Sequence, residues 1–284
     1  MATLLTLRRR IKTARNVSKT TKAMQMIAAS KLKKAQDGAV SSKPYVEKLN
    51  ELSKTLSSKI DQDNLSPYMV KPQNTNTKLY IVISPDKGLC GGLVTNLVRE
   101  VLRLDEKGKQ YFITIGKKIE NYVASFNKEI IASFPFGTTL PSFETVYPLA
   151  KIIDEYFLDK KVSEVIVITT NFVSVFAQTP KVTTLLPISL EEFGHINGST
   201  VIFEPSTDEL LPDLLVHYIE MSIYQSLLES YASEQASRMI AMKNATDNAL
   251  DIIDSLKLTY NKVRQEKITN ELLDIGGGMF ANYG

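Results

Sequence analysis

Apolar residues recur at alternating spacings of three and four in the last quarter of the chain. Residues 213–275 include neither Gly nor Pro, while Pro212 precedes them and Gly276–Gly278 follow them. The spacing predicts a coiled-coil helix, which at about 1.5 Å per residue is about 95 Å long. A helix of that length needs a partner for its apolar face. The seam residues are Tyr218, Met221, Leu228, Ala232, Met239, Met242, Ala249, Ile253, Leu256, Tyr260 and Val263, with Gln225, Gln235 and Thr246 as polar members.

The same spacing occurs at the start of the chain, where neither Gly nor Pro appears before Gly38. We therefore predict a second coiled-coil helix over residues 1–60, which pairs with the C-terminal helix and tail over 209–284. Its pattern continues beyond Pro44, where we expect a bend. The seam residues are Leu4, Leu7, Ile11, Ala14, Ser18, Thr21, Gln25, Ala28, Leu32 and Ala35, followed by Leu49, Leu52, Leu56 and Ile60.

Residues 78–206 have a different pattern, in which short apolar runs alternate with amphipathic stretches. This alternation predicts a mostly parallel sheet with helices on its faces. The fold class is thus α/β plus a long α-helical coiled coil: an antiparallel pair of terminal helices with an inserted Rossmann-like α/β domain, reached through a polar linker over 62–77. Strands are expected at 79–83, 111–115, 164–170, 182–186 and 200–204, and helices at 93–104, 119–126 and 146–157, the last capped by Ser142.

Positive charge is concentrated near the N-terminus, although the net charge of the whole chain is only +3. The first 34 residues hold ten Lys and Arg side chains and no acid. Four interpretations are open: a solvated helix face, a transit peptide, a nucleic-acid-binding surface, and a docking surface for an acidic protein. No aromatic residue interleaves the run, and the run continues in register to Lys34, so the pattern favours the last. Asp247, Asp251 and Asp254 offset only part of this charge.

Candidate chemistry is sparse. The loop Ser84–Gly92 follows an apolar run and enters a helix, as phosphate-binding loops do. It lacks the spacing of the known glycine-rich motifs, which favours a structural turn over a nucleotide site. The single cysteine, Cys90, excludes an internal disulfide framework, and His195 and His217 are isolated in the sequence. We predict no catalytic residue, no metal site and no cofactor site, and no apolar run is long enough to span a membrane.

Three stretches carry a resemblance to a known family. They are Lys19–Lys31 (KTTKAMQMIAASK), Asp86–Leu93 (DKGLCGGL), and Ser233–Ala249 with its continuation over Tyr260–Thr269. In these stretches, and over essentially its whole length, the chain resembles the gamma subunits of F-type ATP synthases, of the bacterial type.

The resemblance implies a rotor shaft that makes no bond itself. Rotation of the membrane c ring, driven by proton or sodium flow, would be coupled through the shaft to ATP synthesis or hydrolysis at the beta-subunit sites. The implied partners are the alpha and beta subunits of the catalytic ring, the epsilon subunit and the c-subunit ring, with no nucleic acid. Membrane association would be peripheral and only through partners, on the cytoplasmic side of the cell inner or plasma membrane.

The family pattern also implies roles for particular residues. Contacts with the beta subunit are expected at Arg264, Gln265, Thr269, Lys22, Met24, Arg8 and Arg9. Contacts with the c ring or epsilon are expected around Phe203 and Glu204. The sequence departs from the family in its glycine-broken, aromatic tail after Ile275, and it lacks the chloroplast-type insertion with a cysteine pair, so thiol control is not expected. The alternative functions are a coiled-coil scaffold or adaptor with an α/β binding module, and an enzyme that uses the Ser84–Gly92 loop.

Overall fold

The computed structural model describes residues 3–57, 66–73, 75–104, 108–188 and 207–281. Two compact units make up the chain. The first, called the coil below, consists of Met1–Ile27 and Met239–Gly284, and the second, called the foot, is Ala28–Arg238. Two long helices, α1 (Leu4–Ser57) and α5 (Thr207–Ala281), contribute residues to both units.

Both long helices continue through residues that often end a helix. Helix α1 includes Pro44 and runs on to Ser57, as predicted, while Ile60 lies outside the described residues. Helix α5 includes both Pro212 and Gly276–Gly278, so its predicted start and end are wrong. Pro212 lies close to the helix start and removes a single backbone donor. Each glycine lowers helix stability by only about 1 kcal/mol relative to alanine, which is too little to end so long a helix.

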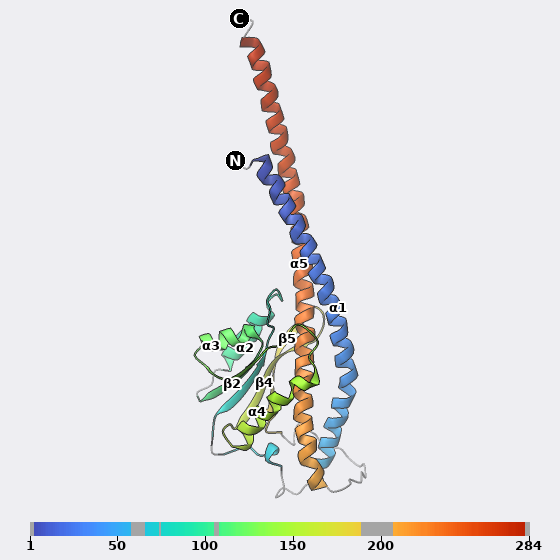
Figure 1. Ribbon diagram of the computed structural model, residues 1–284, viewed down its shortest axis with the longest axis vertical. Coiled ribbons are helices and arrows are strands. Elements are labelled where there is room, and N and C mark those ends of the chain that lie inside the picture. The colour runs from blue at the N-terminus through green and yellow to red at the C-terminus, as the bar shows by residue number, and fades with distance from the viewer. Residues whose placement is uncertain (1–2, 58–65, 74, 105–107, 189–206, 282–284) are drawn as a thin grey trace. The chain divides into compact units, whose positions relative to one another are not determined.

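In the coil, α1 and α5 lie side by side in opposite directions (Figure 1). The hydroxyls of Thr21 and Thr246 share a hydrogen bond of 2.7 Å, and Arg8 Nε donates to the hydroxyl of Tyr260 at 2.9 Å. Residues that come later in α1 therefore contact residues that come earlier in α5. Where the structure describes burial in the coil, the buried residues are all members of the predicted seam: Leu7, Met242, Thr246, Ala249 and Ile253. The predicted antiparallel coiled coil is confirmed.

The foot contains a five-stranded sheet in the order β3-β2-β1-β4-β5. Strands β1 to β4 are parallel, and β5 is antiparallel to β4. Four of the strands match predicted runs, whereas β3 was not predicted and residues 200–204 lie outside the described residues. The strands are β1 (Lys78–Ile83), β2 (Gln110–Ile115), β3 (Glu129–Phe134), β4 (Glu164–Phe172) and β5 (Gln178–Leu186).

Helices cover both faces of the sheet, as the alternating pattern predicted (Figure 1). Helices α2 (Leu93–Arg103) and α3 (Lys117–Ser125) pack on the face that presents Tyr80 and Val82. Helices α4 (Tyr147–Leu158) and α5 lie on the other face. The Ser142 side chain does not cap α4, because a short 3-10 turn, η3 (Phe143–Thr145), separates them, and that part of the prediction is wrong. A second 3-10 turn, η2 (Pro67–Met69), precedes β1.

Candidate partner-binding site

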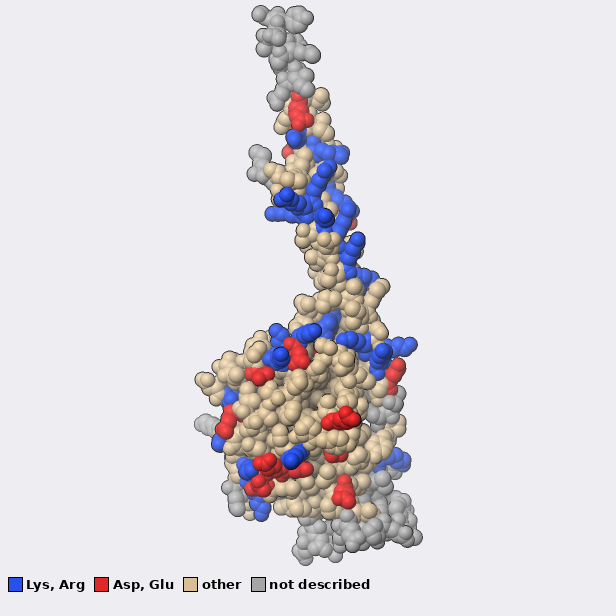
Figure 2. Space-filling view, viewed as in Figure 1, with Lys and Arg blue, Asp and Glu red and all other residues tan. Residues whose placement is uncertain are grey.

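The coil is the basic part of the chain. Its sequence holds 12 Lys and Arg against 6 Asp and Glu, whereas the foot holds 22 against 25. The seven basic residues that α1 contributes to the coil are all exposed, and Figure 2 shows Lys and Arg side chains gathered along it. Within the described residues, Asp254 of α5 pairs with Lys257 of its own helix at 2.8 Å. Most of the positive charge of the coil is thus directed outward.

Five of the predicted contact residues lie together near the start of α1. Arg8 donates to Tyr260, and its guanidinium lies 5.5 Å from the centre of that ring. Arg264 follows one helical turn later on α5, so it lies close to this pair. Gln265 and Thr269 come next along α5, and this helix continues beyond the start of α1 (Figure 1). Arg8, Arg9, Arg264, Gln265 and Thr269 are all exposed, and we call them the tip band.

Lys22 and Met24 form a second group, the middle band. Lys22 is exposed and its amine donates to the side chain of Gln25 at 3.3 Å, while Met24 is half-buried. The neighbouring Thr21 pairs with Thr246, which is about 27 Å along α5 from Arg264 at the usual rise per residue. The structure therefore separates the predicted beta contacts into two bands. Phe203 and Glu204 lie outside the described residues.

The end of α5 that follows Arg264 has apolar side chains without a helix to cover them. Ile268, Leu272 and Leu273 are 48%, 64% and 66% exposed. Large exposed apolar groups that lie close together indicate an interaction surface. Together with the basic bands, these residues indicate that the coil binds other protein chains.

The Ser84–Gly92 loop leaves the sheet beside the point where the strand order reverses, between β1 and β4. Proteins with such sheets bind ligands in the crevice at this point. In the foot, α5 occupies it: the Ser233 hydroxyl donates to the carbonyl of Thr170 at 3.0 Å, and the Ser237 hydroxyl donates to the carbonyl of Cys90 at 2.5 Å. The loop thus serves as a docking edge for the chain's own helix, which favours the structural turn over the nucleotide site.

A buried ion pair adjoins this docking edge. Glu234 is 4% exposed, and one of its carboxylate oxygens lies 2.5 Å from Arg238. The same guanidinium donates to the carbonyls of Lys87 and Gly88 at 3.2 and 3.3 Å. Burial raises the pKa of Glu234, and Arg238 opposes that shift. The second carboxylate oxygen has no hydrogen-bond partner among the described residues.

Sequence reasoning missed these contacts, although their residues belong to two of the three stretches that carried the resemblance. Ser237 and Arg238 lie in the third stretch, and the carbonyls that they reach lie in the second. The lone Cys90 thiol is buried, which raises its pKa above the ordinary value. His217 accepts from or donates to the Tyr45 hydroxyl at 2.7 Å and lies 3.5 Å from Glu220. His195 is outside the described residues.

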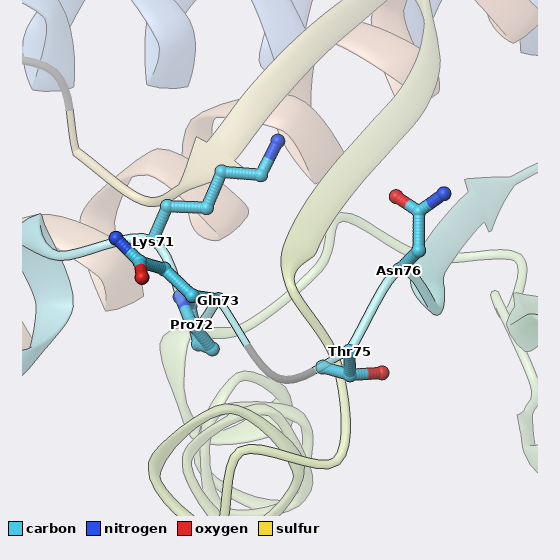
Figure 3. A pocket seen from close by; sticks show the side chains of 5 residues that line it. All are labelled: Lys71, Pro72, Gln73, Thr75 and Asn76. Atoms are coloured by element: carbon cyan, nitrogen blue, oxygen red, sulfur yellow. The ribbon is translucent and has the colours of Figure 1, made fainter.

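Two cavities in the described part of the foot bring no catalytic groups together. An apolar cavity of about 230 Å³ is lined by phenylalanine, proline, leucine and isoleucine side chains, with Thr145 as its polar residue. A hollow of about 590 Å³ before β1 is lined by Lys71, Pro72, Gln73, Thr75 and Asn76, but these side chains point in different directions (Figure 3). In the described ranges, we find no group of three or more His, Cys, Asp or Glu placed to hold a metal ion. None of the described helices is apolar over a length that would cross a membrane.

Comparison with known proteins accounts for nearly the whole chain. A family model described as ATP synthase matches residues 3–281. The ATP synthase gamma chain of Dehalococcoides mccartyi is 38% identical over 283 residues, which cover 99% of both chains. That of Burkholderia thailandensis is 36% identical over 291 aligned positions, with 99% of this chain and 100% of the relative covered.

Solved structures agree with these relatives. A chain of the central stalk and c ring of the Tetrahymena thermophila mitochondrial ATP synthase is 27% identical, with a TM-score of 0.60 over 80% of this chain and 99% of that one. A chain of the Euglena gracilis mitochondrial ATP synthase has the same fold at 20% identity, with a TM-score of 0.70 over 98% and 94% of the two chains. On the strength of the family model and the bacterial relatives, the chain belongs to the ATP synthase gamma chain family.

Proposed function

We propose that this chain is the central shaft of an F-type ATP synthase. Its coil turns inside a ring of three alpha and three beta subunits, and its foot turns with the c ring and the epsilon subunit. The observation that carries the proposal is the exposed basic surface of an antiparallel coil in a member of the gamma chain family. A coiled-coil scaffold or adaptor has no comparable support from the relatives.

The mechanism follows from asymmetry. Three identical catalytic sites differ only if something asymmetric contacts them unequally, and a single shaft within a threefold ring does so at every angle. Each angle adds a different contact energy to the open and closed states of each beta subunit, and so shifts their populations. Rotation therefore carries each site through binding, reaction and release. The chain itself makes no bond, and the chemistry belongs to the beta subunits.

The two bands of the coil supply the contacts. Arg264 of the tip band offers a planar guanidinium that forms charge-assisted hydrogen bonds with a carboxylate of beta at some angles only. Gln265 and Thr269 offer neutral donors beside it. Lys22 and Met24 of the middle band supply a second set of contacts with beta. Because the bands are about 27 Å apart along the helix, they contact different parts of the ring.

At the other end, we propose that the foot binds the c ring and epsilon, with the segment around Phe203 and Glu204 among the contacts. The chain is then held at the membrane peripherally, through its partners, on the cytoplasmic side. Proton or sodium flow turns the c ring, and the foot transmits that rotation to the coil during ATP synthesis. ATP hydrolysis drives the same cycle in reverse.

The test is Arg264→Ala in the assembled membrane enzyme, with ATP hydrolysis and ATP-driven ion uptake measured together. We expect both to fall by about tenfold or more, because a charge-assisted hydrogen bond to beta contributes about 1.5–3 kcal/mol and 1.4 kcal/mol corresponds to a factor of ten. Lys262→Ala is the matched control, since Lys262 is also an exposed base and lies two residues away. Normal hydrolysis and normal uptake in Arg264→Ala would remove this residue from the mechanism.

A further inference from the structure

One face of α5 is attached to the foot by hydrogen bonds from polar side chains. Ser230, Ser233 and Ser237 follow one another at spacings of three and four, so they lie on the same side of the helix. The Ser230 hydroxyl bonds to the Thr169 hydroxyl and accepts from the Thr170 backbone N–H at 3.4 Å. Ser233 and Ser237 donate to backbone carbonyls of β4 and the Ser84–Gly92 loop.

Glu234 and Arg238 directly follow Ser233 and Ser237 in the sequence, so they adjoin this face. Arg238 spans the helix and the loop, because its guanidinium pairs with Glu234 and also donates to the carbonyls of Lys87 and Gly88. Its side chain is 13% exposed and that of Glu234 is 6% exposed. We call Ser230, Ser233, Glu234, Ser237 and Arg238 the α5 lock.

Stability alone does not account for such a face. Replacing a buried ion pair with apolar groups is often neutral or stabilising, and apolar residues already hold α5 elsewhere in the foot, as at Leu227 and Ala236. Apolar contact is non-directional, so it resists rotation of a helix about its own axis only through side-chain shape. Hydrogen bonds to fixed carbonyls are directional, and a turn of the helix breaks all of them together.

We propose that the α5 lock is the element that transmits torque from the foot into the shaft. The lock lies immediately before Met239, the first residue that α5 gives to the coil. It fixes the rotational setting of α5 in the foot, so that the helix turns with the foot instead of slipping within it. The proposal rests on the proposed function, since only a rotor needs such a device, and it assigns a positioning role to residues that contact no catalytic site.

The test compares two variants in the assembled membrane enzyme. Ser233→Ala/Ser237→Ala removes two hydroxyls that bond to the foot. Ser226→Ala is the matched control, because Ser226 is half-buried, as Ser237 is, but its hydroxyl donates to the carbonyl of Ser222 in its own helix at 2.8 Å. For each variant, the ATP hydrolysis rate, ATP-driven ion uptake per ATP, and hydrogen exchange of residues 226–240 are measured.

In the double variant we expect hydrolysis within about twofold of normal and ion uptake per ATP below about half, because each lost hydrogen bond changes the population of a rotated helix by about fivefold. The Ser226→Ala control should couple hydrolysis to ion uptake normally. An enzyme with Ser237→Thr, which keeps the hydroxyl, should also couple normally, in contrast to an enzyme with Ser237→Ala. Normal uptake per ATP in the double variant would overturn the proposal, as would equal losses of hydrolysis and uptake.

Two further outcomes have definite meanings. If the double variant fails to assemble, the single Ser237→Ala enzyme is measured instead, and normal coupling in it would count against the lock. If a membrane enzyme that lacks this chain altogether still couples hydrolysis to ion uptake, the proposed function itself fails, whatever the variants show. Failure of the lock and failure of the shaft are thereby distinguished.

Discussion

Asp86 joins three segments of the foot, so replacing its carboxylate should lower the stability of the foot by an amount that can be estimated. One carboxylate oxygen accepts the backbone N–H of Lys117 at 2.9 Å and that of Phe136 at 3.4 Å, and the other accepts that of Gly137 at 2.8 Å. Lys117 begins α3, while Phe136 and Gly137 follow β3. A single side chain thus ties the end of β1 to the segments that follow β2 and β3.

Asp86→Asn keeps the shape but leaves one accepting oxygen, and its new NH₂ group faces a donor. At about 1.5–3 kcal/mol for each hydrogen bond to a charged group, and with the 3.4 Å contact counted as weak, we expect a loss of about 2–4 kcal/mol. That is a large part of the 5–15 kcal/mol that typically stabilises a domain.

Hydrogen exchange of the full chain measures this loss locally, because exchange in stable elements reports their opening free energy. Peptides covering β1, β2 and β3 should exchange about 30-fold faster or more in Asp86→Asn, since 1.4 kcal/mol corresponds to a factor of ten. Asp159→Asn is the control, as Asp159 is an exposed acid whose ion pair is with Lys161. Exchange within about threefold of normal in Asp86→Asn would show that the carboxylate does not hold these segments together.

Two other changes are predicted in the foot. Gly116→Ala should prevent the sheet from folding, because φ is +100° there and an added Cβ would lie 2.0 Å from a backbone carbonyl oxygen. Gly137→Ala, where φ is +82° and the added Cβ would meet open space, should lower the free energy of unfolding by only about 1–2 kcal/mol. Equal melting curves by circular dichroism for the two variants would contradict this. Lys71 and Lys78 lower the pKa of Glu164 in the folded state, so its stabilising effect should be complete above the ordinary glutamate pKa and lost as the pH falls through the lowered one. Urea midpoints should therefore fall with acid more steeply in the natural chain than in Glu164→Gln, and parallel curves would count against the ion pairs.

The coil was predictable because a pattern of neighbouring residues in the sequence specifies it. A helix seam repeats every three or four residues, so Leu7, Thr246 and Ile253 could be placed without knowing what they contact. The polar seam members followed the same rule, and the structure pairs Thr21 with Thr246 across the predicted seam. The helix ends were less predictable, because the cost of Gly276–Gly278 is small compared with the stability of a long helix.

Some features of the foot could not be predicted from short stretches of sequence. Strand β3 lies at one edge of the sheet and its residues are only partly buried, so Glu129–Phe134 has no continuous apolar run to mark it. The α5 lock depends on pairs that are far apart in sequence: Ser237 and the carbonyl of Cys90 are separated by 147 residues. A serine in a helix carries no sequence signal for the carbonyl that it will meet. The resemblance marked both stretches but not their contact.

As the proposed shaft, this chain rotates within a catalytic ring. The most direct measurement fixes a complex of alpha, beta and this chain to a surface through the ring, attaches a bead to the foot, and records the bead during ATP hydrolysis. We expect continuous rotation in one direction with three pauses per turn, one for each beta subunit. ATP hydrolysis at a normal rate with a stationary or randomly moving bead would contradict it.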